Sequence, residues 1–290
     1  MNSKKWTALL LALTLCFALA ACSAGGSAAT ATPAPTPSAP AETAPAPEDD
    51  WSYIRSKGEL VIGITIYEPM NYYNDQGKLI GFDTEFAEAV CEKLGITAKF
   101  VEINWETKEV ELASKNIDCI WNGLTVTEER KANMDFSESY IKNMQSVVIK
   151  AANSDKFTDT DSLSQANLVA EVSSAGESAI ADHPVLSGAN YVAVAKQTGA
   201  LLEVKAGTAD AAVLDYVLAK AMVGEGTDYS DLMIVPGLEL AVEEYAIGFR
   251  VGSTAVLEVN AAIDALIADG TLNAIAEAYV LEAQLIANQQ

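Results

Sequence analysis

Strands and helices alternate along most of this chain, and this order is the strongest constraint on its fold. Residues 60–66 form an uncharged run rich in β-branched residues, which is typical of a strand covered on both faces. A helix capped by Asp83 is expected through Leu94, where Gly95 ends it. The next elements are expected to be a strand at 96–103, a helix at 105–114 and a strand at 117–121. Alternation of this kind predicts a mostly parallel, doubly wound sheet.

The same alternation begins again after residue 167. Strands are expected at 168–172, 191–194 and 211–214, and helices at 177–182, at 198–206 and from residue 216. An apolar run at 245–250 and two helices, at 255–268 and 272–285, follow. Two α/β units with a crevice between them predict a ligand site, because ligands bind beyond the carboxyl ends of parallel strands.

The first fifty residues belong to neither unit. Two lysines precede an apolar run over residues 9–20, which is too short to span a bilayer and is typical of a secretory signal peptide. Its end, Leu-Ala-Ala-Cys22, resembles a bacterial lipobox, which implies cleavage after residue 21 and acylation of Cys22. The alternative is a signal peptide with a chance cysteine. Residues 22–50 hold six of the nine prolines and predict an extended tether.

The chain is strongly acidic, with 40 Asp and Glu against 18 Lys and Arg. Removing residues 1–21 takes away two lysines and no acids, so 16 basic residues remain against 40 acidic ones, a net charge of −24. This charge disfavours nucleic acid and anionic lipid heads as partners. We expect an extracytoplasmic protein held to the cell membrane by its acyl anchor alone.

Two cysteines, Cys91 and Cys119, remain after the signal peptide and the acylation site are set aside. Cys91 falls on the apolar face of an expected helix and Cys119 in a buried strand. This placement favours two packed thiols over a disulfide. The chain has one histidine and no zinc-binding spacing, so neither a metal site nor a cofactor is expected.

Arg130 stands where a cation is unfavourable. Thr127 is the best N-cap of the helix after the strand at 117–121, which puts Arg130 at the third helical position. Glu or Gln is usual there, because the positive end of the helix dipole disfavours a cation by about 0.3 to 1 kcal/mol. Arg130 either pairs with Asp135 or Glu129 or binds an anion that is not part of the chain.

Four segments resemble the family 3 solute-binding proteins of polar amino-acid ABC transporters. They match in collinear order from about residue 60 to 279: GFDTEFAEAVCEKLG (81–95), NIDCIWNGLTVTEERKANMDFS (116–137), GTADAAVLD (207–215) and YAIGFR (245–250). The resemblance implies an α/β, two-lobed clamshell of the type II periplasmic-binding-protein class, in which each lobe is a mostly parallel sheet flanked by helices. Lobe 1 would comprise residues 51–141 and 246–290, and lobe 2 residues 142–245, with two crossover strands at the hinge.

The resemblance also implies which residues hold an amino acid. Arg130 would bind its α-carboxylate bidentately, and Asp215 would bind its α-ammonium. The further ligand-binding candidates are Thr125 and the backbone at Ser174 and Ala175 for the carboxylate, the carbonyl of Gly123 for the ammonium, Tyr67 and Trp105 as aromatic walls, and Asn122 facing the crevice.

Each of these roles has an ordinary structural alternative. Asp215 ends an apolar strand, where a carboxylate is costly unless it is paired, but it could simply cap the next helix. Tyr67 and Trp105 could be core aromatics, as Trp121 is expected to be. Asn122 could only satisfy backbone groups.

Glu171 is where the chain departs from many relatives. They often carry Gln or Lys at this position, and an acid near the end of the first strand, where this chain has Ile-Thr-Ile at 64–66. A carboxylate at Glu171 would favour a cationic ligand such as lysine, ornithine or arginine, unless it points to solvent or pairs within its own lobe.

The expected function is that of a monomeric receptor which delivers a polar amino acid, cationic if Glu171 faces it, to an ABC permease and its ATPase. One alternative is a cyclohexadienyl dehydratase-like enzyme with Glu171 as general acid or base, although no catalytic nucleophile stands out. The other is an amino-acid-sensing domain.

Overall fold

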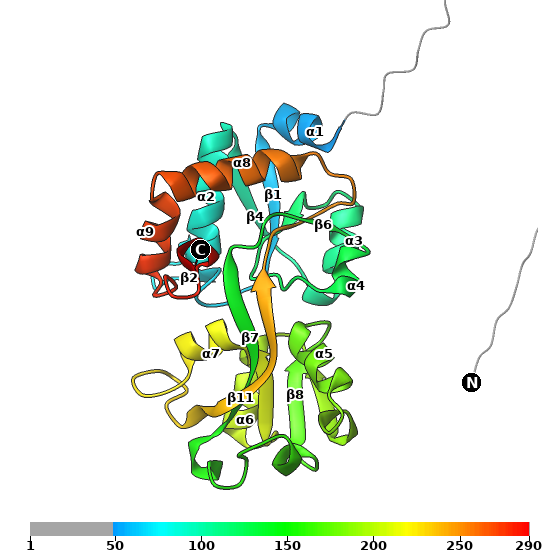
Figure 1. Cartoon of the computed structure of the whole chain (residues 1–290), viewed down its shortest axis with the longest axis vertical. Coiled ribbons are helices and arrows are strands. Elements are labelled where there is room, and N and C mark those ends of the chain that lie inside the picture. The colour runs from blue at the N-terminus through cyan, green and yellow to red at the C-terminus, as the bar shows by residue number, and fades with distance from the viewer. Residues whose placement is uncertain (1–48, 290) are drawn as a thin grey trace, which may run out of the picture. The chain divides into compact units, whose positions relative to one another are not determined.

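Two lobes make up the part of the chain that the structure, a computed structural model, describes, residues 49–289 (Figure 1). Each lobe is built on its own sheet, and two long strands run between the lobes. The expected signal peptide at residues 1–21, the acylation site at Cys22 and the tether up to residue 48 lie outside the described residues.

The sheet of lobe 1 consists of β1 (Glu59–Ile64), β4 (Thr97–Glu102), β5 (Cys119–Ile120), β6 (Asp135–Phe136) and β12 (Gly248–Phe249). Its strand order is β4-β1-β5-β12-β6. β1 is parallel to β4 and β5, with Ile62 opposite Phe100 and Cys119, and β12 and β6 join antiparallel. β1 is buried from its second residue onward, as expected of a strand covered on both faces.

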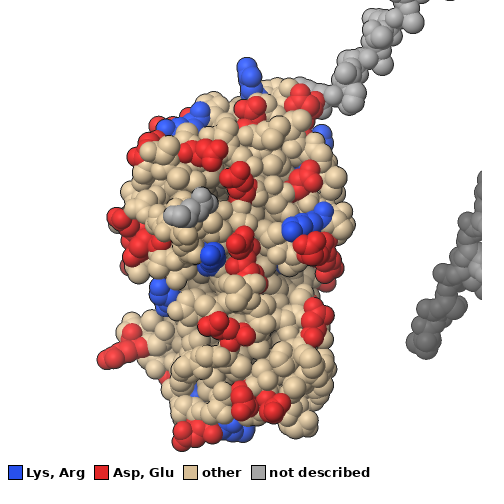
Figure 2. Space-filling view, viewed as in Figure 1, with Lys and Arg blue, Asp and Glu red and all other residues tan. Residues whose placement is uncertain are grey.

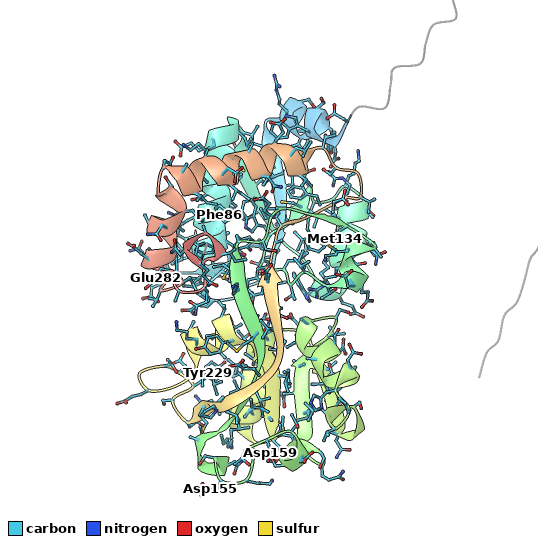
Figure 3. All side chains as sticks on the ribbon, viewed as in Figure 1. Phe86, Met134, Asp155, Asp159, Tyr229 and Glu282 are labelled. Atoms are coloured by element: carbon cyan, nitrogen blue, oxygen red, sulfur yellow. The ribbon has the colours of Figure 1, made fainter. Side chains whose placement is uncertain are left out.

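The helices of lobe 1 are α1 (Asp50–Lys57), α2 (Phe82–Leu94), α3 (Lys108–Ala113), α4 (Glu128–Lys131), α8 (Ala255–Ala268) and α9 (Thr271–Ala278). Trp105–Thr107 and Ile286–Gln289 are 3₁₀ turns, and β2 (Tyr72–Tyr73) pairs with β3 (Leu79–Ile80). α2 packs on α8, and Phe86 of α2, labelled in Figure 3, meets Trp121 edge-on at 5.1 Å between ring centroids. Trp121 is fully buried, which confirms its expected core position.

The sheet of lobe 2 consists of β7 (Ile141–Lys150), β8 (Asn167–Glu171), β9 (Asn190–Val194), β10 (Ala211–Asp215) and β11 (Leu232–Tyr245), in the order β11-β7-β10-β8-β9. β8 is parallel to β9 and β10, whereas β7 is antiparallel to β10 and β11. The flanking helices are α5 (Ala175–Asp182), α6 (Gln197–Ala206) and α7 (Tyr216–Met222), with 3₁₀ turns at Ala151–Asn153, Asp161–Leu163 and Leu186–Gly188.

β7 and β11 are the two crossover strands (Figure 1). They pair antiparallel from Leu232 opposite Lys150 to Tyr245 opposite Ile141. At the lobe 1 end Tyr245 also forms a bridge with Thr125, so the hinge strands are tied directly to the loop before α4. The structure therefore confirms the two-lobed α/β fold with two crossover strands at the hinge. The sheets are mixed rather than wholly parallel, because β12 in lobe 1 and β7 in lobe 2 run antiparallel to their neighbours.

Two helix boundaries differ from the sequence-based expectation. α2 begins at Phe82, not after Asp83, since Gly81 takes the N-cap position with a φ of 130° that favours glycine. The expected final helix at 272–285 ends as α9 at Ala278. Val280 adopts a φ of 57°, and the amide of Leu281 donates to the carbonyl of Ala276 at 2.8 Å, which is a Schellman ending without its usual glycine.

Lobe 1 begins slightly before the expected start at Trp51, since α1 begins at Asp50. Asp50 accepts two hydrogen bonds from Arg250, at 3.0 and 2.8 Å.

Cys91 and Cys119 are both buried and free, which confirms two packed thiols.

Candidate ligand-binding site

A cavity of about 370 Å³, counted with its opening to solvent, lies between the two lobes. The structure brings all ten predicted site residues to its wall: Tyr67, Trp105, Asn122, Gly123, Thr125 and Arg130 from lobe 1, and Glu171, Ser174, Ala175 and Asp215 from lobe 2. Thr65, Ile66, Gln197 and Leu218 complete the lining. The convergence follows from the topology, since the lobe 2 residues stand at or just after the carboxyl ends of β8 and β10.

Arg130 is a buried cation without an ionic partner in the described part of the chain. Thr127 caps α4 by accepting from the Arg130 amide at 3.1 Å, as expected. The guanidinium donates from Nη1 to the carbonyl of Thr125 at 2.8 Å and from Nη2 to that of Ser173 at 3.2 Å. No carboxylate among residues 49–289 lies within 4.0 Å of it, so pairing with Asp135 or Glu129 is wrong. Burial lowers the pKa of Arg130.

Asp215 is the buried anion opposite. Its Oδ1 accepts from Gln145 Nε2 at 2.5 Å and from Asn143 Nδ2 at 3.0 Å, and its Oδ2 accepts from Gln197 Nε2. Within residues 49–289 no Lys or Arg lies within 4.0 Å of it. Its side chain makes no cap bond to α7, so the capping alternative is also wrong. A buried carboxylate held only by amides retains the capacity to bind a cation.

Two aromatic residues form walls of the cavity. The Tyr67 hydroxyl lies 2.6 Å from that of Tyr245, and burial raises the pKa of Tyr67 well above its usual value. Trp105 lies beneath two cations, with Arg130 5.8 Å and Lys108 4.8 Å from its ring centroid. Both rings are nearly inaccessible to solvent yet line the cavity.

The loop after β5 is fixed by its own hydrogen bonds. Asn122 Oδ1 accepts from the Thr65 amide at 2.8 Å and from Asn71 at 3.0 Å, and its Nδ2 donates to Thr65 Oγ1 at 2.8 Å. Asn122 therefore lines the cavity, but Oδ1 and Nδ2 of its side chain already have hydrogen-bond partners. Gly123 has a φ of 56°, and a Cβ there would lie 2.6 Å from Tyr67, so glycine is required beside the ring.

The lobe 2 rim of the cavity is the N-terminus of α5. Ser174 is its N-cap and accepts from the Glu177 amide at 3.1 Å, and Ala175 begins the first turn. The first amides of a helix lack intrahelical acceptors and carry partial positive charge, which suits a carboxylate.

Glu171 is buried and faces the cavity, so the alternative that it points to solvent is wrong. Burial, followed by the negative charge of Asp215, raises the pKa of Glu171 to about 8. Lys108 stands nearby, and burial and Arg130 lower the pKa of its ammonium to about 8. Its Nζ donates to the carbonyls of Trp105 at 3.2 Å and Ser173 at 3.1 Å.

Sequence reasoning missed the polar residues of the crossover strands. Thr125 Oγ1 donates to Glu243 Oε1 at 2.9 Å, and the same oxygen accepts from Asn143 at 2.6 Å and Gln145 at 2.9 Å. A usable signal was present: Asn143 and Gln145 alternate with other residues along β7, and Glu243 precedes Tyr245 by two residues on β11, so each pair shares one face.

Residues 49–289 lack two features that some proteins of this size have, a metal-ion site and a membrane-spanning helix. No group of three or more His, Cys, Asp or Glu side chains there could hold a metal ion. Likewise, none of the described helices has the length and apolar character needed to cross a membrane.

Two α/β lobes joined by two strands, with a polar cavity between them, define a type II solute-binding protein. The profile of the bacterial extracellular solute-binding proteins, family 3, matches residues 60–282, and the chain belongs to this family.

Relatives and solved structures agree with this assignment. The chain is 27% identical over 226 residues to the L-cystine-binding protein TcyJ of Escherichia coli K12, a match that covers 77% of this chain and 83% of TcyJ. It is 29% identical over 225 residues to the L-arginine-binding protein of Pseudomonas aeruginosa, covering 75% and 86% of the two chains. The crystal structure of the ancestral amino acid-binding protein AncCDT-1, a precursor of cyclohexadienyl dehydratase, matches with a TM-score of 0.71 at 25% identity, covering 78% of this chain and 97% of that one.

Proposed function

We propose that this protein is the amino-acid receptor of an ABC importer, which captures a free amino acid between its lobes and delivers it to the permease. One observation carries the proposal: Arg130 and Asp215 are both buried in the wall of one cavity, on opposite lobes, and neither has an ionic partner among the described residues. A zwitterion supplies both missing charges, and an α-amino acid carries them a short distance apart.

The proposed binding mode uses donors that Arg130 still has free. A guanidinium has five N–H donors, and carbonyls take one from Nη1 and one from Nη2. The remaining donors would bind the α-carboxylate, together with the amides at Ser174 and Ala175. Thr125 would contribute its hydroxyl by leaving Glu243. The α-ammonium would bind Asp215 and the carbonyl of Gly123, and Tyr67 and Trp105 would enclose the side chain.

Closure of the hinge would follow from the same contacts. We place the lobe boundaries at residues 141–142 and 245–246, in the crossover strands. Each of the two sites would take groups from both lobes, Arg130 with the Ser174 and Ala175 amides for the carboxylate and Gly123 with Asp215 for the ammonium, so only the closed state provides both in full. The Ser173 carbonyl adds two bonds across the cleft, from Arg130 and from Lys108, and these favour closure with any ligand.

Glu171 would select among amino acids. Its side chain is a buried acid beside the cavity, and a ligand with a cationic side chain would pair with it. The arginine-binding relative is consistent with a cationic ligand, whereas the cystine-binding relative is consistent with a polar one of no net charge.

A second candidate is a cyclohexadienyl dehydratase-like enzyme. The observation in its favour is the pKa of about 8 for Glu171, which suits a general acid or base near neutral pH. The named relatives compared above are binding proteins, which favours the receptor.

The deciding experiment measures binding and turnover on the same purified protein. Thermal melts with each of the proteinogenic amino acids and with ornithine should show a shift for one class, because ligand at 100 times Kd adds about 2.7 kcal/mol. Incubation with prephenate or arogenate should leave the substrate unchanged. Turnover of either acid without a shift by any amino acid would support the enzyme instead.

The location of the receptor rests on residues outside those described. We propose that Cys22 is acylated after cleavage at residue 21, and that residues 22–50 tether a monomer to the outer face of the cell membrane. Acidic side chains are spread over both lobes on the face shown in Figure 2, which keeps the lobes away from anionic lipid heads. Labelling cells with a fatty-acid analogue would test the anchor, and Cys22→Ser should abolish the label.

A further inference from the structure

Glu243 and Asp215 form a pair of acids at the hinge. Glu243 lies on crossover strand β11, and Asp215 ends β10 of lobe 2. Asn143 Nδ2 donates to Asp215 Oδ1 at 3.0 Å and to Glu243 Oε1 at 2.6 Å, and Gln145 Nε2 donates to the same two oxygens at 2.5 and 2.9 Å. Because both oxygens lie within 3.0 Å of the same two nitrogen atoms, the two carboxyl groups are close neighbours.

No cation neutralises this pair within residues 49–289. Arg130 is the nearest guanidinium in the cavity, but it lies more than 4.0 Å from either acid and is bonded to carbonyls. The other titratable groups around the pair are Glu171 at the end of β8 and the hydroxyls of Tyr67 and Tyr245, and the charge of Lys108 of α3 acts on Glu171. Asp215 is buried and Glu243 is half-buried, and two adjacent carboxylates in such a setting cannot both stay ionised at modest cost, so Glu243 retains a proton.

We propose that the Glu243–Asp215 pair holds one proton in the absence of ligand and releases it to solvent when the ammonium group of the ligand binds, so that capture of the amino acid is coupled to deprotonation of Glu243. This inference rests on the proposed function. The ammonium group binds Asp215 and supplies the positive charge beside the pair in place of the proton, and Glu243 leaves the step as a carboxylate.

The surroundings of Glu243 fit this role. Burial, followed by the charge of Asp215, raises the pKa of Glu243 to about 8, so the proton is present at neutral pH. Glu243 also accepts from Thr125 of lobe 1 and from Asn143 and Gln145 of the other crossover strand. Loss of the proton would therefore change the charge of Glu243 at the point where the lobes, the hinge and the ligand site meet.

The coupling has a definite pH dependence. Below about pH 8 the proton must leave before or as the ligand binds, so the association constant should rise by up to about tenfold per pH unit between pH 6 and 8 and then level off. Lys108, with a pKa lowered to about 8, and Glu171, with a pKa raised to about 8, titrate in the same range. A variant at Glu243 separates its contribution from theirs.

Calorimetry of the purified protein tests the inference. The probe is the amino acid that gives the largest thermal shift in the panel above. Titration at pH 7 in buffers with different ionisation enthalpies should show release of nearly one proton per ligand bound. The Glu243→Gln variant, which keeps the side-chain shape, should release nearly one proton fewer than the unchanged protein and show a correspondingly weaker pH dependence.

Glu244→Gln is the matched control, because Glu244 is the next residue of β11 and its side chain is exposed. This variant should release the same number of protons as the unchanged protein. Binding without proton release, or equal release in Glu243→Gln, would overturn the inference and leave the receptor function standing. Failure of every amino acid to bind would overturn both.

Discussion

Replacing Arg130 by alanine should weaken ligand binding far more than it weakens the fold. Arg130 is 7% exposed, and its guanidinium has no carboxylate partner within the described residues. The variant would leave the α-carboxylate of the ligand buried and unpaired, which costs about 2 to 5 kcal/mol. Since about 1.4 kcal/mol is tenfold in affinity, Kd should rise by roughly 30-fold to several thousand-fold.

The stability of the ligand-free protein should change little in Arg130→Ala. Alanine removes two hydrogen bonds, to the carbonyls of Thr125 and Ser173, but it also removes the desolvation cost of an unpaired cation. These effects oppose each other, so the ligand-free melting temperature should change little. Arg130→Lys should recover part of the affinity, because an ammonium keeps the charge but loses the bidentate geometry.

Isothermal titration calorimetry with the best-binding amino acid is the assay. Lys131→Ala provides the control, since Lys131 is the next residue of α4 and its side chain is half exposed in a surface pair with Glu128. It should bind as the unchanged protein does. An affinity of Arg130→Ala within about threefold of the Lys131→Ala value would refute the carboxylate role of Arg130.

The remaining predictions concern selectivity and stability. Glu171→Gln should weaken binding of arginine, lysine or ornithine by about tenfold or more, while the affinity for neutral amino acids, measured by competition calorimetry, should not change. An equal loss of affinity for cationic and neutral amino acids would exclude a selectivity role. Asp118→Ala should lower the free energy of unfolding by about 3 to 5 kcal/mol in urea titrations, because Asp118 is fully buried and bonded to Lys57 at 2.6 Å, to the Val61 amide at 2.8 Å and to Arg250 at 3.3 Å; a loss under 1 kcal/mol would contradict this. The ligand-free protein should lose stability as pH rises from 6 to 8. Glu171 has a folded-state pKa raised to about 8, against roughly 4.3 unfolded, so the folded state binds the extra proton over this window and loses that advantage as pH passes 8. Urea titrations at pH 6, 7 and 8 should show the fall, and Glu171→Gln should reduce it; a flat profile in the unchanged protein would contradict the assignment.

The cavity wall was largely predictable from the sequence. Arg130 follows a readable N-cap at Thr127, and Asp215 ends an apolar strand, so local patterns mark both residues. The resemblance to the family then indicated that they face one crevice. Their roles in binding remain predictions, because geometry places them at the cavity without showing what they bind.

The sequence by itself determined the order of strands and helices, the helix end at Gly95 and the positions of the cavity residues at strand ends. These features depend on the spacing of apolar residues, on helix caps and on turn residues, all of which shape the backbone within a few positions along the chain. Only the tertiary structure decided that Val280 ends α9, that Asp83 lies inside α2, and that Glu243 meets Asp215 through Asn143 and Gln145. The physical reason is distance along the chain: Glu243 and Gln145 are 98 residues apart, and only the pairing of β7 with β11 brings them into hydrogen-bond contact.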